Sequence, residues 1–214
     1  MHRESWGRVR ARAGRGRLLV TAIATVVSAV SASMVAPQSA SAASHSESRP
    51  ESDSFTWLSP AAAPATWHRV TTQSGQAVLS YPPPFMPIAG DRGSASAAVK
   101  SRTGKILAYV NVTPREGDEQ LKGFARFRVH LIGEDDDRDV HLDSSAGNLA
   151  FRGGTGSCVI DDYLTRVSDN HYKEIACFVV GQQASSVVVV AAANADWNHF
   201  LPLLRKCVAS FRIS

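Results

Sequence analysis

Alternating hydrophobic and polar positions run through the chain from about residue 66 onward and predict a series of short strands. The pattern is clearest on either side of the polar break at residues 167–171. Cys158 and Ile160 fall on one face of the run before the break. Ile175 and Cys177 fall on one face of the run after it. We interpret this stretch as an antiparallel hairpin at the centre of the domain.

The other strand runs also pair around short turns. Hairpins are predicted over residues 68–81, 94–112 and 140–152, the last turning at Ala146-Gly147-Asn148. The run Tyr81–Phe85 must leave the sheet, because its three successive prolines cannot donate ladder hydrogen bonds. A rigid crossover is favoured there over a proline-rich partner motif. The apolar run 187–193 fits a strand buried on both faces.

Two segments have the spacing of amphipathic helices. The first is predicted to begin near residues 117–118, and the second after Asn194 or Asp196, with Phe211 as a core plug at its end. Their apolar faces are, in chain order, Leu121, Phe124, Phe127 and Leu131, then Trp197, Leu201, Leu204 and Val208. About eight strands with two helices predict an α+β fold, a mainly antiparallel sheet packed with two helices.

The first 42 residues have the layout of a secretory signal peptide. A basic region ends at Arg17, an apolar run follows, and cleavage is expected after Ala42, with Ala32 as the alternative. An uncleaved membrane anchor is the other interpretation, and it is the one way we expect membrane contact. Residues 43–65 are rich in Ala, Ser and Pro and predict a flexible linker. Residues 66–214 then form a single domain.

The net charge of +4 does not indicate nucleic-acid binding. Residues 1–42 contain six of the 23 basic side chains and one of the 19 acidic ones, which leaves 17 basic and 18 acidic side chains in the remainder. The exported part is therefore nearly neutral, and we predict no nucleic-acid partner.

Three cysteines in an exported chain predict a disulfide, because the compartment is oxidising. Cys158 and Cys177 lie on strands expected to be neighbours, so this pair is favoured over Cys177 with Cys207. A hairpin centred on residues 169–170 would leave the favoured pair about four residues out of register. The bridge therefore requires a turn nearer residues 167–168, or a bulge.

No catalytic, cofactor-binding or metal-binding residue is predicted. Nucleophile-elbow, zinc-protease and Cys-x-x-Cys motifs do not occur in the sequence. The acidic run 134–139 lacks the glycine and terminal glutamate of a calcium loop and is interpreted as a solvated loop. Asp161 and Asp162 are adjacent on a strand, so they point to opposite faces and cannot act as a pair. The glycines of residues 153–156 are expected to form a turn or bulge.

The domain resembles the PsbP-like superfamily, which includes exported actinobacterial proteins and LpqN-type mycobacterial lipoproteins. The resemblance rests on Tyr81-Pro82 after the opening hairpin, on YVNVTPREGDEQL at residues 109–121, and on the closing strand followed by residues 197–211. It covers roughly residues 66–214 and implies an α/β/α sandwich with a non-catalytic role.

Together these observations predict a secreted or envelope-associated accessory protein that is not an enzyme and needs no cofactor. Its partner would be an extracytoplasmic protein. The alternative is a carrier of a small lipid or glycan, held in a cleft between the sheet and the helices.

Overall fold

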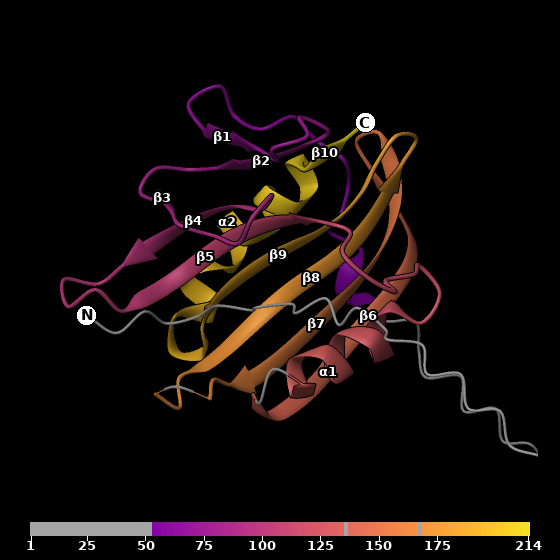
Figure 1. The fold of residues 1–214 in the computed structure, drawn as a ribbon. Coiled ribbons are helices and arrows are strands. Elements are labelled where there is room, and N and C mark those ends of the chain that lie inside the picture. Colours follow the sequence, from indigo (N-terminus) through magenta and orange to yellow (C-terminus); the bar gives the residue numbers. More distant parts are fainter. Residues whose placement is uncertain (1–52, 135–136, 167) are drawn as a thin grey trace, which may run out of the picture. The chain divides into compact units, whose positions relative to one another are not determined.

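Seven strands form one antiparallel sheet in this computed structural model, which describes residues 53–134, 137–166 and 168–214 (Figure 1). The strand order is β3-β4-β5-β9-β8-β7-β6, so β3 and β6 form the two edges. The strands are β3 (Met86–Ile88), β4 (Ala95–Lys100), β5 (Ile106–Pro114), β6 (Arg138–Phe151), β7 (Gly154–Leu164), β8 (His171–Gly181) and β9 (Ser185–Ala193).

A second sheet and two helices complete the fold. The small sheet has the order β1-β2-β10, with β1 (His68–Thr71), β2 (Ala77–Tyr81) and β10 (Arg212–Ile213). Helix α1 (Phe124–Glu134) lies on one face of the large sheet, over β6 and β7. Helix α2 (Trp197–Ser210) and the small sheet lie on the other. Two single-turn 3₁₀ helices are η1 (Asp53–Phe55) and η2 (Asn194–Asp196). The predicted α+β fold class is confirmed.

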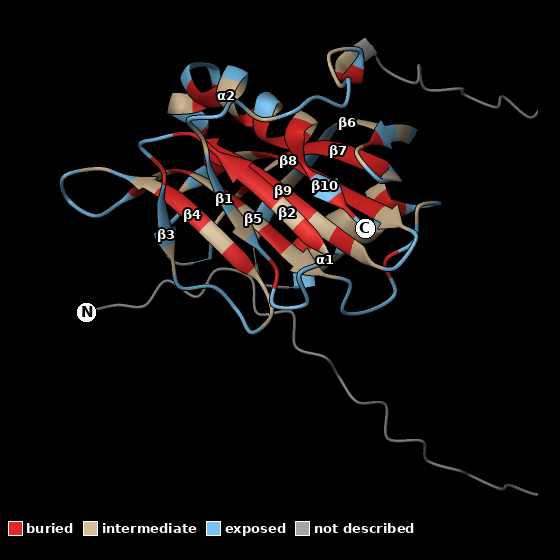
Figure 2. Ribbon diagram, turned by 90° about the horizontal axis from the view of Figure 1, so that it is seen from above, coloured by how far each residue is buried: buried red, intermediate tan, exposed pale blue. Residues whose placement is uncertain are grey.

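Both faces of the large sheet are buried, as Figure 2 shows for its central strands. The larger core lies between the sheet and α2, where Val190 and Cys177 pack with Leu204. The smaller core lies under α1, where Phe124 stacks on Phe178 at a ring-centroid distance of 5.9 Å. Strand β9 is apolar on both faces because it lies in the middle of both cores, which confirms the prediction for residues 187–193.

Two predicted elements are wrong in their boundaries. Helix α1 begins at Phe124, and the segment expected to start it near residue 117 is not helical. The hairpin expected over residues 140–152 is instead one strand, β6, of 14 residues. Its pairing with β7 shifts between Ala146 and Leu149, and Asn148 has a φ of 56°, so the polar residues there form an irregularity within the strand. The chain reverses later, at Gly153, where φ is 92°.

The folded domain begins earlier than the sequence predicts. Residues 53–65 were expected to be part of the linker, yet Phe55 is buried and Trp57 packs against the larger core. The backbone N–H of Ala61 donates to the carbonyl of Ala209 at 2.9 Å, which ties this segment to the end of α2. The predicted signal peptide and the linker residues 43–52 lie outside the described residues. Across the described ranges, no helix is both long and apolar enough to cross a membrane.

Candidate functional site

A disulfide joins Cys158 to Cys177, the pairing favoured from the sequence. The two residues lie directly opposite each other in the β7–β8 pair, as do Leu164 and His171, so the midpoint of the pairing falls between positions 167 and 168. No bulge is needed to bring the cysteines together. Cys207 is a free, buried thiol on α2, and burial raises its pKa to about 12. It therefore behaves as a small apolar side chain and not as a nucleophile.

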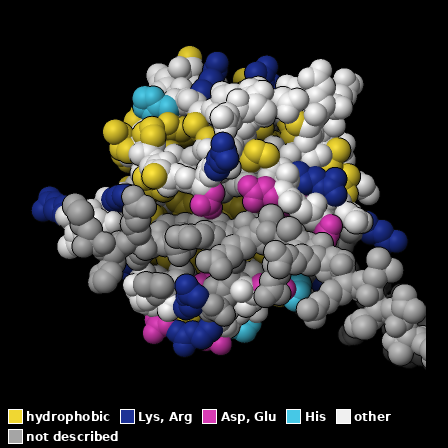
Figure 3. Space-filling view, in the orientation of Figure 1, with side chains coloured by type: hydrophobic (Ala, Val, Ile, Leu, Met, Phe, Trp, Pro, Cys, Tyr) yellow, Lys and Arg dark blue, Asp and Glu magenta, His cyan; other side chains and the backbone are white. Residues whose placement is uncertain are grey.

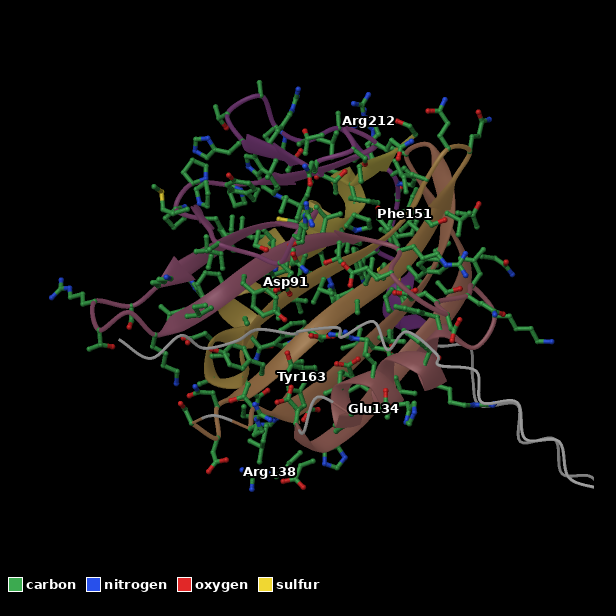
Figure 4. All side chains as sticks on the ribbon, in the orientation of Figure 1. Asp91, Glu134, Arg138, Phe151, Tyr163 and Arg212 are labelled. Carbon is green, nitrogen blue, oxygen red and sulfur yellow. A yellow bond between two sulfur atoms is a disulfide. The ribbon has the colours of Figure 1, made fainter. Side chains whose placement is uncertain are left out.

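A cluster of ionisable side chains lies buried between α1 and the sheet. It consists of Tyr109 on β5, Arg128 on α1, Asp161 and Tyr163 on β7, and Glu174 on β8. Glu174 and Asp161 are direct cross-strand partners, and the register places both on the face that α1 covers. Figure 4 labels Tyr163, which lies on the sheet beside α1. The cluster therefore draws on three strands and a helix that are far apart in the sequence.

Arg128 is the cation of this cluster. Its Nε and Nη2 atoms both donate to Glu174 Oε1, at 2.8 and 2.5 Å. The hydroxyl of Tyr163 donates to Glu174 Oε2 at 3.2 Å, and that of Tyr109 to the same oxygen at 3.4 Å. Every oxygen of the Glu174 carboxylate is thus hydrogen-bonded, although the side chain is fully buried.

Asp161 differs from Glu174 because neither of its buried oxygens has a hydrogen-bond partner in the part of the chain that the structure describes. Burial, and then the adjacent Glu174 carboxylate, raise the pKa of Asp161 well above its ordinary value. A neutral Asp161 gains an O–H that can donate to the Glu174 carboxylate facing it. One cation and one proton together balance the two buried carboxylates.

The pKa values of the other groups in the cluster are shifted by the same burial and by the neighbouring charges. Burial raises the pKa of the Tyr109 and Tyr163 phenols, so both remain protonated donors. Burial alone would lower the pKa of Arg128, but the attraction of the adjacent Glu174 carboxylate raises it overall. The arrangement holds α1 on the sheet through a charged hydrogen-bond network centred on Glu174. We assign it a structural role, because the carboxylates of Asp161 and Glu174 are fully buried and offer a substrate no direct access.

This cluster was not predicted from the sequence, because only apolar residues were expected on the helix face. The inward face of α1 is Phe124, Arg128 and Ile132, at i, i+4 and i+8. The available signal was a pair of carboxylates, Asp161 and Glu174, on the faces of strands that are otherwise apolar. Asp162 points to the face opposite Asp161, as expected for adjacent residues on a strand. Its Oδ1 lies 2.7 Å from Nε2 of His171.

The space between the sheet and the helices is filled by side chains. Under α1 it holds Phe124 and Ile132, and under α2 it holds Phe200 and Leu204, all buried. The two best-formed hollows in the described residues are open surface grooves of about 440 and 340 Å³, and both lie away from these spaces. The described part of the chain also contains no group of three His, Cys, Asp or Glu side chains placed to hold a metal ion. Neither groove lies between the sheet and the helices, where the cleft of a ligand carrier was expected.

An apolar edge is the clearest surface feature of the large sheet. We define it as residues 83–89, which include the edge strand β3. Met86 is 66% exposed and is the one large hydrophobic side chain of the described residues that stands exposed. Pro83, Pro84 and Pro87 are exposed beside it. Figure 3 shows hydrophobic side chains gathered over the region where Figure 1 draws β3 and β4.

Phe85 anchors the apolar edge to the core. That side chain is buried and meets Phe200 of α2 edge-to-face, with ring centroids 6.3 Å apart. Pro87 lies in the middle of β3 and has no N–H to offer a further strand. A partner would therefore bury the side chains of this edge and would not extend the sheet. A rigid crossover was expected at Tyr81–Phe85, and the buried Phe85 fits that interpretation.

Comparisons with known proteins support the fold but not a function. No protein-family model matches the chain, and no curated protein matches it in sequence. The fold is similar to that of the cyanobacterial PsbP protein CyanoP from Synechocystis, with a TM-score of 0.51 and 13% identity. The match covers 71% of this chain and 95% of CyanoP. The expected PsbP-like architecture is thus present as a structural likeness.

Two further solved structures are less similar. LpqN of Mycobacterium tuberculosis, described as involved in cell envelope biogenesis, has a TM-score of 0.43 at 12% identity, covering 69% of this chain and 90% of LpqN. A protein of unknown function from Pseudomonas aeruginosa has a TM-score of 0.41 at 12% identity, covering 64% and 89%. These likenesses carry no functional argument for this chain.

Proposed function

We propose that this protein is a secreted or envelope-associated accessory protein that binds a partner protein and catalyses no reaction. The apolar edge carries the proposal. Exposed apolar groups that lie together on a surface favour a protein interface, since water hydrates them poorly and a partner can bury them. Met86 and the three prolines present such groups on a backbone that is already rigid, so binding would cost little conformational entropy.

The proposed location outside the cytoplasm rests on two observations of different kinds. The first 42 residues have the sequence of a secretory signal peptide. The disulfide between Cys158 and Cys177 fits an oxidising compartment. Mass mapping of the exported protein under non-reducing conditions would test both. A mature N-terminus after Ala42 or Ala32, with this disulfide intact, is the expected result.

The binding surface is tested with a photo-crosslinking amino acid at position 86 of the exported protein. We expect it to capture a specific partner protein in the culture medium or the cell envelope. The same crosslinker at Gln73, exposed on the β1–β2 turn, should not capture that partner. Failure to capture any specific protein from position 86, or equal capture from both positions, would contradict the proposal.

Once a partner is purified, its affinity tests the role of the apolar edge directly. Met86→Glu places a charge where a methionine is expected to be buried, and burial of such a side chain is worth about 1.5–3 kcal/mol. We therefore expect dissociation constants at least about tenfold weaker. Gln73→Glu introduces the same charge elsewhere and should leave the affinity unchanged. An unchanged affinity for Met86→Glu would rule out this edge as the interface.

A further inference from the structure

Three arginines converge on a groove at the outer face of the small sheet. We call it the arginine groove and define it by its volume of about 340 Å³ and its lining. Arg69 on β1 lies opposite Ser80, and Arg212 on β10 lies opposite Val78, so all four side chains share the outer face. Arg152, on the turn between β6 and β7, lines the same groove. Figure 4 places Arg212 at the upper edge of the molecule, at β10.

The backbone holds two of these arginines side by side. Residue 152 forms a parallel bridge with residue 212, and the N–H of Ile213 donates to the carbonyl of Arg152 at 3.0 Å. This close approach requires glycine at position 153. Its φ is 92°, and a Cβ there would lie 1.9 Å from the carbonyl oxygen of Ile213. The glycine run that the sequence predicted as a turn thus also positions Arg152 against β10.

Within residues 53–134, 137–166 and 168–214, no acidic side chain lines the groove, and no ion pair involves Arg69, Arg152 or Arg212. Elsewhere on the domain, arginines such as Arg138 pair with a carboxylate. Like charges held close together repel one another, and the repulsion is relieved when an anion binds between them.

The remaining lining leaves room for a small polar group. Thr71 on β1 and Ser80 on β2 add hydroxyls. One wall is formed by Ala62 and Ala63, whose short side chains do not fill the groove. The hydrogen bond from Ala61 to Ala209 fixes this wall against α2. The site is therefore preorganised by backbone contacts on both sides.

We propose that the arginine groove binds a phosphoryl group. Guanidinium groups match the geometry of phosphate oxygens and can bind them through two parallel hydrogen bonds. A phosphate monoester carries about −1.5 to −2 charge at pH 7, which suits three arginines better than the single charge of a carboxylate. The hydroxyls of Ser80 and Thr71 can donate to the remaining oxygens. This site is separate from the apolar edge and does not depend on the proposed partner protein.

The test is a titration of the ¹⁵N-labelled exported protein with sodium phosphate at pH 7, followed by NMR, with sodium acetate and sodium chloride at equal ionic strength as comparisons. We expect phosphate to shift the Arg Nε–H signals and the backbone signals of β1 and β10, and to saturate. Arg69→Gln and Arg212→Gln should each weaken phosphate binding by about tenfold, the loss of one charge-assisted contact. Arg102→Gln, on the exposed β4–β5 turn, should not change it.

The source of the phosphoryl group is identified with vesicles. Phosphatidylcholine vesicles with and without phosphatidic acid, whose headgroup is a phosphate monoester, are sedimented with the same three variants. Binding that requires phosphatidic acid and both groove arginines assigns the site to a lipid headgroup. Saturable binding of inorganic phosphate without such cosedimentation assigns it to a free or esterified phosphate.

Two outcomes would overturn the proposal. One is that neither phosphate nor the anionic vesicles bind in a way that depends on Arg69 and Arg212. The other is that acetate produces the same saturating shifts as phosphate. Because Gln retains most of the volume of Arg at exposed positions, thermal melts of the variants should match the unsubstituted protein, so lost binding would not reflect unfolding. A Gly153→Ala variant should weaken phosphate binding while leaving all three arginines in place.

Discussion

Asp161 should make the stability of this protein fall as the pH rises, and Asp161→Asn should remove that dependence. Burial and the facing Glu174 raise the pKa of Asp161 above its ordinary value of 3.8 in the folded state. The folded protein therefore holds a proton that the unfolded chain releases above about pH 4. The stabilisation is fully present below that pH and is lost progressively until Asp161 ionises in the folded state. Asparagine has the same shape as the neutral acid, can donate to Glu174, and cannot ionise.

The magnitude follows from linkage. Each pH unit between the unfolded and the folded pKa changes the free energy of unfolding by at most about 1.4 kcal/mol. Between pH 4.5 and 6.5, the stability of Asp161→Asn relative to the unsubstituted protein should therefore rise by up to about 2.5 kcal/mol. Because the comparison subtracts the other titrating groups, the slope of this difference reports the Asp161–Glu174 pair.

The assay is urea unfolding at several pH values, followed by tryptophan fluorescence with the disulfide intact. Asp118→Asn is the matched control, because Asp118 is exposed, and its difference curve should be flat. If the difference curve of Asp161→Asn were also flat from pH 4.5 to 6.5, the folded-state pKa of Asp161 would not be raised. The inference that Asp161 holds a proton facing Glu174 would then be wrong.

Two further predictions concern stability. In the same urea assay, Arg128→Met should lower the free energy of unfolding by about 3 kcal/mol, because it leaves Glu174 charged and buried without its cation. Arg126 is exposed, so the control Arg126→Met should change the free energy of unfolding by less than about 0.5 kcal/mol. Phe55→Ala should cost about 3 kcal/mol if residues 53–65 belong to the domain, with the exposed Ser59→Ala as control; a melting temperature unaffected by Phe55→Ala would show that this segment contributes nothing to the core.

The local pattern of apolar and polar residues was sufficient to predict much of the fold. Period-two alternation identified the strands around Cys158 and Cys177, and an apolar run without alternation identified β9, because these patterns follow directly from which faces of a strand are buried. The face of α2 was also readable, since Trp197, Leu204 and Val208 recur at helical spacing and are buried. Positions where a polar residue interrupts such a pattern were misjudged. Asn148 was interpreted as a turn, but long-range pairing of β6 with β7 keeps it in a strand.

The α+β class, the central hairpin and the best-placed cysteine pair could be predicted from local patterns, because each depends on neighbours within a few residues or on one strand pair. The buried network of Arg128, Asp161 and Glu174 and the convergence of Arg69, Arg152 and Arg212 appear only in the folded chain. Each of these sets joins side chains from separate elements, and a charged residue looks the same in a sequence whether it faces water or another charge. Their environment, and hence their chemistry, exists only once the sheets have paired and the helices have packed against them.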